Sequence, residues 1–308
     1  MAPWPTRPIR LLIGFPPGSV QDLSARSFAE PLAKALGQPV IVENKAGASG
    51  TIAATQVAKA TDEHTFGVMN NSQLTIAKLL NPAVAYDPAK DLAPIALIGT
   101  APLLLVVSQA ATGTTPQEWL VWLRNQGAKG NYGSPGAGTP GHLGVEFLKS
   151  RIGFEAAHIP YSGNPQVINA LLGGQLQAAL MQPSLALPHV QAGKLKAIGV
   201  TSSGRSALAP GIPTLREVGV QGSDFELWTA LAGPASMPAP IREKMEAALI
   251  KVVKSEEVRS RLLNVGWQPA PSTAEVPKKR MRQDTATFGR TILMRGVKVG
   301  NWARTVRT

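Results

Sequence analysis

The sequence contains no cysteine and few aromatic residues. With no cysteine among its 308 residues, the chain cannot form a disulfide, use a thiolate nucleophile or bind a metal through sulfur. No run of about 18 uninterrupted apolar residues is present, so we expect no membrane-spanning helix. The 44% hydrophobic and 16% charged content is typical of a globular protein with one large or two medium-sized domains.

Groups that could carry out catalysis are also scarce. The four histidines show neither H-x-x-x-H nor H-E-x-x-H spacing, which argues against a zinc site, and the G-x-S-x-G signature of a serine hydrolase is missing. We therefore expect no metal, no cofactor and no enzymatic activity.

The net charge of +12 is best explained by a basic, solvated surface, with a local excess of lysine and arginine near the C-terminus. Nucleic-acid binding would need basic residues interleaved with aromatic ones, or a recognisable reader motif. Aromatic residues make up only 5% of the chain and no such motif is present, so we predict no nucleic-acid partner.

The most informative segment is residues 129–142 (KGNYGSPGAGTPGH), which predicts a short strand, a glycine-rich loop and the start of a helix. Thr139 suits the N-cap position, and Pro140 suits the first helical position. Open amides of the loop, together with the positive end of the helix, favour an anion. His142 could bond the ligand or have a packing role. The predicted contacts in this segment are Ser134, Ala137, Gly138, Thr139 and His142.

A second loop of this kind lies near the N-terminus, between an apolar strand at 10–15 and a helix at 20–36. Ser19, followed by Asp22 three residues later, has the form of a capping box. Pro31 lies inside the predicted helix and is expected to kink or split it. The predicted ligand contacts from this loop are Phe15, Pro17, Gly18 and Ser19.

The order strand, loop, helix, strand, loop, helix, strand occurs twice, at 10–69 and at 130–181. It predicts an α/β fold with two lobes, each a mainly parallel sheet covered by helices, and a ligand cleft at the carboxyl ends of the strands. We expect lobe 1 to comprise 1–103 and 226–308, and lobe 2 to comprise 104–225, with hinge crossings near 100–106 and 222–230. Strand ends add the predicted contacts Asn71, Ser72, Tyr161 and Met181. We also expect a short helix at 213–217, and disorder after Gly296.

An alternative function is an NAD(P)-binding enzyme, because Gly136-x-Gly138-x-x-Gly141 has the form of a dinucleotide fingerprint. Against it, the preceding strand is short and polar, and no acidic residue follows about 20 positions later at the end of a second strand.

The sequence resembles a known family. Residues 4–18 (WPTRPIRLLIGFPPG) are similar to the opening of the Bug (TctC-like) proteins, the extracytoplasmic solute receptors of tripartite tricarboxylate transporters. The resemblance continues through 37–44 (GQPVIVEN), 86–88 (YDP), 131–134 (NYGS), 158–161 (HIPY), 171–174 (LLGG), 187–189 (LPH) and 192–195 (AGKL). It implies a periplasmic-binding-protein type II fold that closes on a small carboxylate, with no catalysis. It also implies a periplasmic location for a mature chain, membrane permease subunits as partners, and a monomer.

Two departures from the family pattern bear on the ligand. Ser19 stands where the family often has a second glycine, and it could add a hydroxyl contact. Met181, or Gln182 if the alignment slips by one residue, stands where the family often has an aspartate that holds an amino group. The resemblance therefore favours a ligand without an ammonium group. Phe15, Tyr161 and Met181 would offer apolar contact to an aromatic or aliphatic mono- or dicarboxylate.

Overall fold

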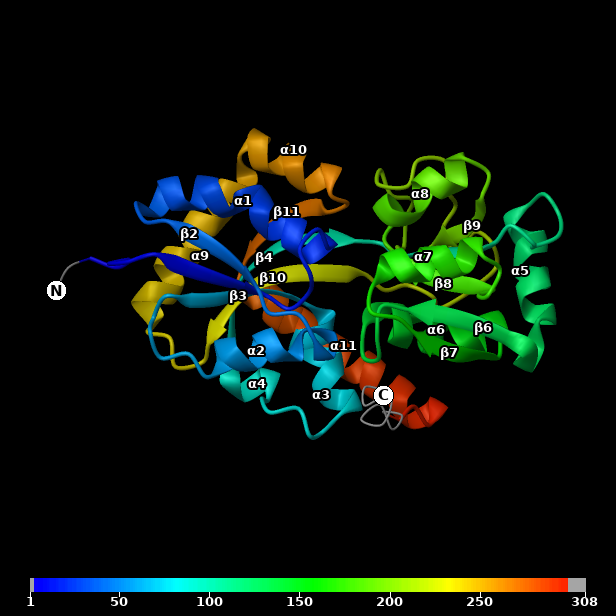
Figure 1. The fold of residues 1–308 in the computed structure, drawn as a ribbon, viewed down its shortest axis with the longest axis horizontal. Coiled ribbons are helices and arrows are strands. Elements are labelled where there is room, and N and C mark those ends of the chain that lie inside the picture. Colours follow the sequence, from blue (N-terminus) through cyan, green and yellow to red (C-terminus); the bar gives the residue numbers. More distant parts are fainter. Residues whose placement is uncertain (1–2, 299–308) are drawn as a thin grey trace.

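The computed structural model describes residues 3–298 of the protein and has two lobes, each built on one sheet with helices on its faces (Figure 1). The strand order is β11-β4-β10-β3-β1-β2 in lobe 1 and β7-β6-β8-β5-β9 in lobe 2. The strands of lobe 1 are β1 (Ile9–Ile13), β2 (Val40–Asn44), β3 (Thr65–Asn70), β4 (Leu92–Ala101), β10 (Leu227–Pro234) and β11 (Gln268–Thr273). Those of lobe 2 are β5 (Leu104–Ser108), β6 (Gly130–Ser134), β7 (Ala156–Pro160), β8 (Ala178–Met181) and β9 (Leu195–Val200).

The helices pack around these sheets. Lobe 1 carries α1 (Val20–Leu36), α2 (Thr51–Ala58), α3 (Ala77–Leu80), α4 (Pro88–Asp91), α9 (Ala239–Lys254), α10 (Glu256–Asn264) and α11 (Glu275–Arg295), with the short helices η1 (Ala48–Gly50) and η2 (Ser72–Ile76). Lobe 2 carries α5 (Pro116–Asn125), α6 (Pro140–Ile152), α7 (Asn164–Leu172) and α8 (Pro183–Gln191), with η3 (Gly127–Lys129). No helix among residues 3–298 is long and apolar enough to cross a membrane.

Both sheets are mixed, whereas the sequence predicted mainly parallel ones. The expected parallel pairs are present, β1 with β2 and β3, and β6 with β7 and β8. β10 pairs antiparallel with β3 and β4, β11 with β4, and β5 with β8 and β9. The physical reason is chain direction: β5, β10 and β11 start at the side facing the other lobe, while β1, β3, β6 and β8 end there.

Helix α1 is one continuous element through Pro31, so the expected split does not occur. Proline removes the helical N–H that would have bonded the carbonyl of Ser27. The guanidinium of Arg261 on α10 donates to that carbonyl at 3.4 Å. At the helix start, the Ser19 side chain accepts from the Asp22 N–H, as the capping pattern predicted.

Some elements differ from the sequence-based expectation. The short helix expected at 213–217 is not formed: Thr214 makes an isolated bridge with Val200, and a turn follows at 215–219. The Thr214 N–H donates to the Glu217 carboxylate, and the Glu217 N–H donates to Thr214 Oγ1. Helix α8, strand β11 and the long helix α11 were not predicted. The disorder predicted after Gly296 concerns mainly residues 299–308, which lie outside the described part of the chain.

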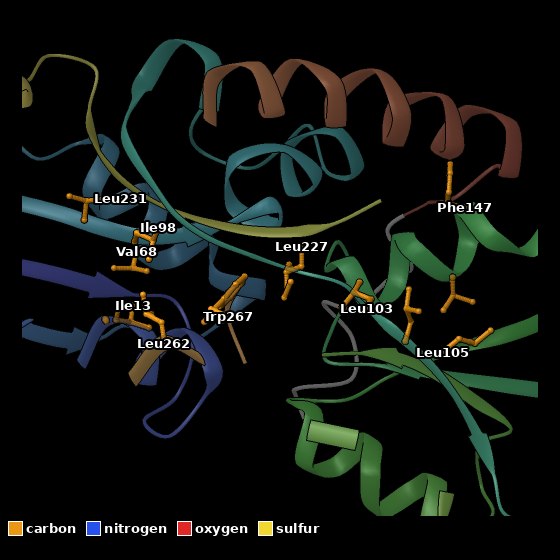
Figure 2. Close-up of a cluster of buried hydrophobic side chains, with 14 of the residues drawn as sticks. Ile13, Val68, Ile98, Leu103, Leu105, Phe147, Leu227, Leu231, Leu262 and Trp267 are labelled. Carbon is orange, nitrogen blue, oxygen red and sulfur yellow. The ribbon is translucent and has the colours of Figure 1, made fainter. Parts of the chain in front are cut away.

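The two lobes share one apolar core through the hinge. Figure 2 shows Leu227 of β10 and Leu103, just before β5, between the side chains of the two lobes, with Trp267 beside them. Strands β4 and β10 belong to one sheet and β5 to the other. The lobe boundaries at 103/104 and 225/226 stay a prediction.

Helix α11 is a third link between the lobes, in addition to the two strand crossings. Its Phe288 belongs to a buried cluster with Ile76 and Leu80 of lobe 1 and Leu143 of α6 in lobe 2. Near its end, the guanidinium of Arg295 lies 2.9 Å from a carboxylate oxygen of Glu155. Helix α11 therefore ties lobe 2 to lobe 1 on the side shown at the bottom of Figure 1.

Truncation of Phe288 should therefore destabilise the whole fold. Because Phe288 is 1% exposed, Phe288→Ala should lower the free energy of unfolding by about 3–5 kcal/mol in urea denaturation. Leu293→Ala on the same helix is the control, since Leu293 is 84% exposed and should change stability by less than about 0.5 kcal/mol. Equal small effects in both variants would show that α11 does not join the lobes energetically.

Candidate functional site

A cavity of about 370 Å³ lies between the lobes, where the strands end, and its size is in the range of small-molecule sites. Lobe 1 contributes the loop before α1, the start of η2 and Trp267. Lobe 2 contributes the starts of α6, α7 and α8 and the end of β8. Leu103 and Leu227 line it from the hinge.

Four helices begin at this cavity. The lining residues include those at the starts of α1 (Val20, Gln21), α6 (Pro140, Gly141) and α7 (Asn164, Pro165), and Gln182, which caps α8. Helix N-termini carry partial positive charge and leave backbone N–H groups without helical partners. The arrangement therefore favours an anion.

No charged side chain lines the cavity within residues 3–298. An anion bound there would meet amides, hydroxyls and an indole instead of a lysine or an arginine. The absence of a lining carboxylate also leaves no acidic partner for an ammonium group. The polar side chains Ser72 and Trp267 are buried at 0% and 1% exposure, and Ser72 Oγ and Trp267 Nε1 have no hydrogen-bond partner in the described chain.

Two hydrogen bonds join the lobes directly. Ser49 Oγ of lobe 1 donates to the carbonyl of Ala137 in lobe 2 at 2.8 Å. Gln182 Nε2 of lobe 2 lies 3.4 Å from the carbonyl of Gly266, the residue before Trp267. The structure therefore shows direct contacts between the two lobes.

The cavity brings together seven of the thirteen predicted contact residues, from both predicted loops and two strand ends. They are Phe15, Pro17, Gly18, Ser19, Ser72, Thr139 and Met181. A role of these residues in ligand binding stays a prediction.

Three other predicted residues point their side chains elsewhere. Asn71 bonds Asp284 of α11 and the Trp228 N–H, so its amide holds α11 against β10. Ala137 packs against the cluster around Phe288. Tyr161 packs in the lobe 2 core, and its ring would lie 3.4 Å from a Cβ at Gly133. None of the three lines the cavity.

In the loop from Ser134 to Gly138, the backbone N–H groups of Gly136 and Gly138 donate to the side chains of Ser134 and His142. The expectation that the amides of this loop are open to a ligand is therefore wrong for these two. Ser134 Oγ lies 2.6 Å from His158 Nε2, and it also accepts from the Gly136 N–H at 3.2 Å. The Gly138 N–H donates to His142 Nδ1 at 3.2 Å, with Gly138 at φ +77°. Neither Ser134, Gly138 nor His142 lines the cavity, which Thr139, Pro140 and Gly141 reach instead.

His142 has the packing role that was its alternative. Its ring stacks on His158 with centroids 3.9 Å apart and an interplanar angle of 8°. Burial, and secondarily the charge of Lys149, lowers the pKa of His142 to about 4. Burial, and secondarily the electrostatic effect of His142, lowers the pKa of His158 to about 3. Both rings are therefore neutral at pH 7, and their hydrogen bonds to Ser134 and Gly138 fix the conformation of the loop.

Asp22 also has the structural role that the capping pattern favoured. Its carboxylate accepts from the Gly18 N–H at 2.8 Å, and from Arg26 and Asn44 at 3.0 Å each. These bonds fix the loop that carries Gly18 and Ser19 at the cavity.

Sequence reasoning missed the starts of α7 and α8 and the side chain of Trp267. The first two could have been found, because α7 and α8 follow strands β7 and β8, whose carboxyl ends lie at the same edge as that of β6. Gln182, named only as the alternative to Met181, lines the cavity beside it. Nothing in the local sequence marks Trp267, which reaches the cavity through the pairing of β11 with β4.

Two lobes with a cavity between them, at which four helices begin, have the architecture of a two-lobed binding protein. The model of the tripartite tricarboxylate transporter family receptor, TctC, matches residues 24–297, and the chain belongs to this family. A UPF0065 protein of Bordetella pertussis is 36% identical over 267 residues, which cover 86% of this chain and 82% of that protein.

Solved structures agree with this assignment. MatC from Rhodopseudomonas palustris, with bound malate, is 30% identical, with a TM-score of 0.84 over 94% of this chain and 100% of that one. A second R. palustris protein, solved with adipate, is 26% identical, with a TM-score of 0.88 over 96% and 99%. Because the family is one of solute receptors, the chain is a binding protein and not an enzyme, and the NAD(P) alternative is rejected.

The histidine stack predicts how stability depends on pH. Both rings have a folded-state pKa below the ordinary 6.5. Their contribution to the free energy of unfolding is therefore complete above pH 6.5 and is lost as the pH falls toward 4. In urea denaturation, the free energy of unfolding of the wild type should fall as the pH falls from 6.5 toward 4. In His158→Gln this slope should be smaller by up to about 1.4 kcal/mol per pH unit, the most that one titrating group can contribute.

The wild-type protein is the control for this measurement. Burial raises the pKa of Asp284 to about 6, so protonation of Asp284 below pH 6 increases the free energy of unfolding, opposite to the effect of the histidines. This effect is the same in the wild type and the variant. Identical slopes in the two proteins would contradict the neutral stack.

Proposed function

We propose that this receptor captures a small carboxylate, with an aromatic or other dicarboxylate as the leading class, and delivers it to the membrane permease of a tripartite tricarboxylate-type transporter. The family assignment supports the transporter partner and a periplasmic location. A monomer, with lobe 1 formed by 1–103 and 226–308 and lobe 2 by 104–225, completes the proposal.

The observation that carries the proposal is a cavity with four helix N-termini and no charged side chain within the described residues. Partial positive charge from the helix ends favours a carboxylate, and the lack of an acidic side chain disfavours an amino acid. The two structurally similar R. palustris proteins were solved with bound malate and with adipate, which supports an acid as the ligand.

Closure around the ligand follows from the same geometry. The starts of α1 and of α6 to α8 come from different lobes, so an anion meets all of them only when the lobes are together. Ligand therefore stabilises the closed arrangement by making contacts that the open one lacks.

The direct test is thermal unfolding of the purified protein with a panel of mono- and dicarboxylates, and with amino acids as the comparison. A carboxylate should raise the melting temperature in a concentration-dependent way. Stabilisation by amino acids in preference to simple acids would overturn the proposal.

Met181 is the position to test the charge preference. Met181→Asp would place a carboxylate among the helix N-termini, where it repels the ligand and competes for the same amides. We expect calorimetry to show affinity for the best carboxylate reduced by about a hundredfold or more. Met181→Leu, which conserves volume, should retain binding. Melting followed by circular dichroism checks that both variants fold, and unchanged affinity in a folded Met181→Asp protein would place the ligand elsewhere.

A further inference from the structure

The turn between β2 and α2 has an unusual backbone. Residues 47–50 all have positive φ, at +129°, +48°, +54° and +86° in chain order. Ala48 and Ser49 carry side chains, which makes this conformation costly, and within residues 3–298 only one other non-glycine residue, Glu63, has a positive φ. Strain of this kind persists only where the surroundings hold it, and it is concentrated at ligand clamps and switch regions.

Contacts within lobe 1 hold this turn in place. A Cβ added to Gly50 would lie 2.5 Å from Gln73 Nε2 of η2. A Cβ added to Gly14, which follows β1, would lie 2.5 Å from the α-carbon of Gly50. The Gly50 N–H also donates to the Gly47 carbonyl at 3.0 Å. Because all these contacts come from lobe 1, we expect the turn to keep its conformation whether or not lobe 2 touches it.

The strained turn presents Ser49 to lobe 2. Ser49 Oγ donates to the Ala137 carbonyl at 2.8 Å, and a Cβ added to Gly136 would lie 2.9 Å from the same Oγ. A Cβ added to Gly138 would be in van der Waals contact with α3 of lobe 1. The loop at 136–138 therefore rests on lobe 1 at each of its three residues.

The same loop continues into the cavity. Thr139 lines the cavity, and its hydroxyl donates to the Gly136 carbonyl at 2.7 Å. Pro140 and Gly141, at the start of α6, line the cavity as well, whereas Ser49 does not. A bond from Ser49 to this loop therefore fixes the N-terminus of α6 relative to lobe 1 without touching a ligand.

We propose that Ser49 is a positioning residue for ligand binding. It acts as a latch, in that its hydroxyl bonds the Ala137 carbonyl when the lobes close and holds the start of α6 at the ligand. This inference rests on the proposed function and deepens it, because it assigns part of the ligand affinity to a residue outside the cavity. Ligand enters before this bond forms and leaves after it breaks, so the latch slows dissociation and leaves association unchanged.

The test removes the hydroxyl in two ways. Ser49→Ala keeps a side chain in the left-handed conformation, whereas Ser49→Gly also relieves the strain. Thr51→Ala is the matched control, because Thr51 Oγ1 also donates to a carbonyl at 2.8 Å, that of Ala48, but within lobe 1.

The probe is the acid that most raises the melting temperature of the wild type, chosen from a panel of mono- and dicarboxylates that includes malate and adipate. Its affinity for the wild type and the three variants is measured by calorimetry. Its association and dissociation rates are measured by stopped-flow tryptophan fluorescence.

We expect both Ser49 variants to bind the acid about three- to tenfold more weakly, the scale of one hydrogen bond between uncharged groups, and to release it faster by the same factor. Thr51→Ala should match the wild type in affinity and in both rates. Without ligand, Ser49→Gly should melt at or above the temperature of Ser49→Ala, because glycine adopts positive φ without strain. The loss of affinity is thus separated from any loss of stability.

Wild-type affinity in both Ser49 variants would overturn the inference. So would a loss in Ser49→Ala that Ser49→Gly restores, because strain and not the hydroxyl would then set the affinity. A loss carried by slower association, or an equal loss in Thr51→Ala, would overturn it too. In each case the proposed function survives, since the wild type still binds a carboxylate. If no acid of the panel binds the wild type, the proposed function fails, and this inference fails with it.

Discussion

The proposed function sets one electrostatic constraint, which is that an anion between the lobes would have to be stabilised without a charged side chain among the described residues that line the cavity. A bare carboxylate loses its hydration when it enters a cavity of this kind, and it needs donors in return. Helix N-termini supply them from fixed backbone, and four of them start at the cavity. Within residues 3–298, the lysine and arginine side chains behind the net charge of +12 lie outside the cavity lining.

The sheets explain why the helix ends meet there. Parallel strands β1, β3, β6 and β8 end at the side facing the other lobe, so three of the helices that follow them, α1, α6 and α8, begin at that side. The shared apolar core at the hinge and helix α11 hold the lobes at this distance. The contacts of Ser49 with Ala137 and of Gln182 with Gly266 lie between the lobes.

The fold was predictable where local patterns repeat. Most helices and strands follow from apolar spacing, capping residues and proline at helix starts, as Ser19 and Asp22 at the start of α1 illustrate. Strand direction was less predictable, because β5, β10 and β11 reverse it by entering a lobe from the cleft. Helix α11 escaped prediction because its buried face is discontinuous, with only Pro277, Phe288 and Thr291 buried.

The sequence by itself determined the two-lobed α/β class, the family, and the two loops that reach the cavity, since capping residues, glycines and motifs are local properties of the chain. Tertiary structure decided which atoms of those loops are free. Stacking of His142 on His158 turns Gly138 inward, the Asn71 side chain reaches Asp284, and strand pairing brings Trp267 to the cavity. These outcomes depend on contacts between residues far apart in the chain, which no local pattern encodes.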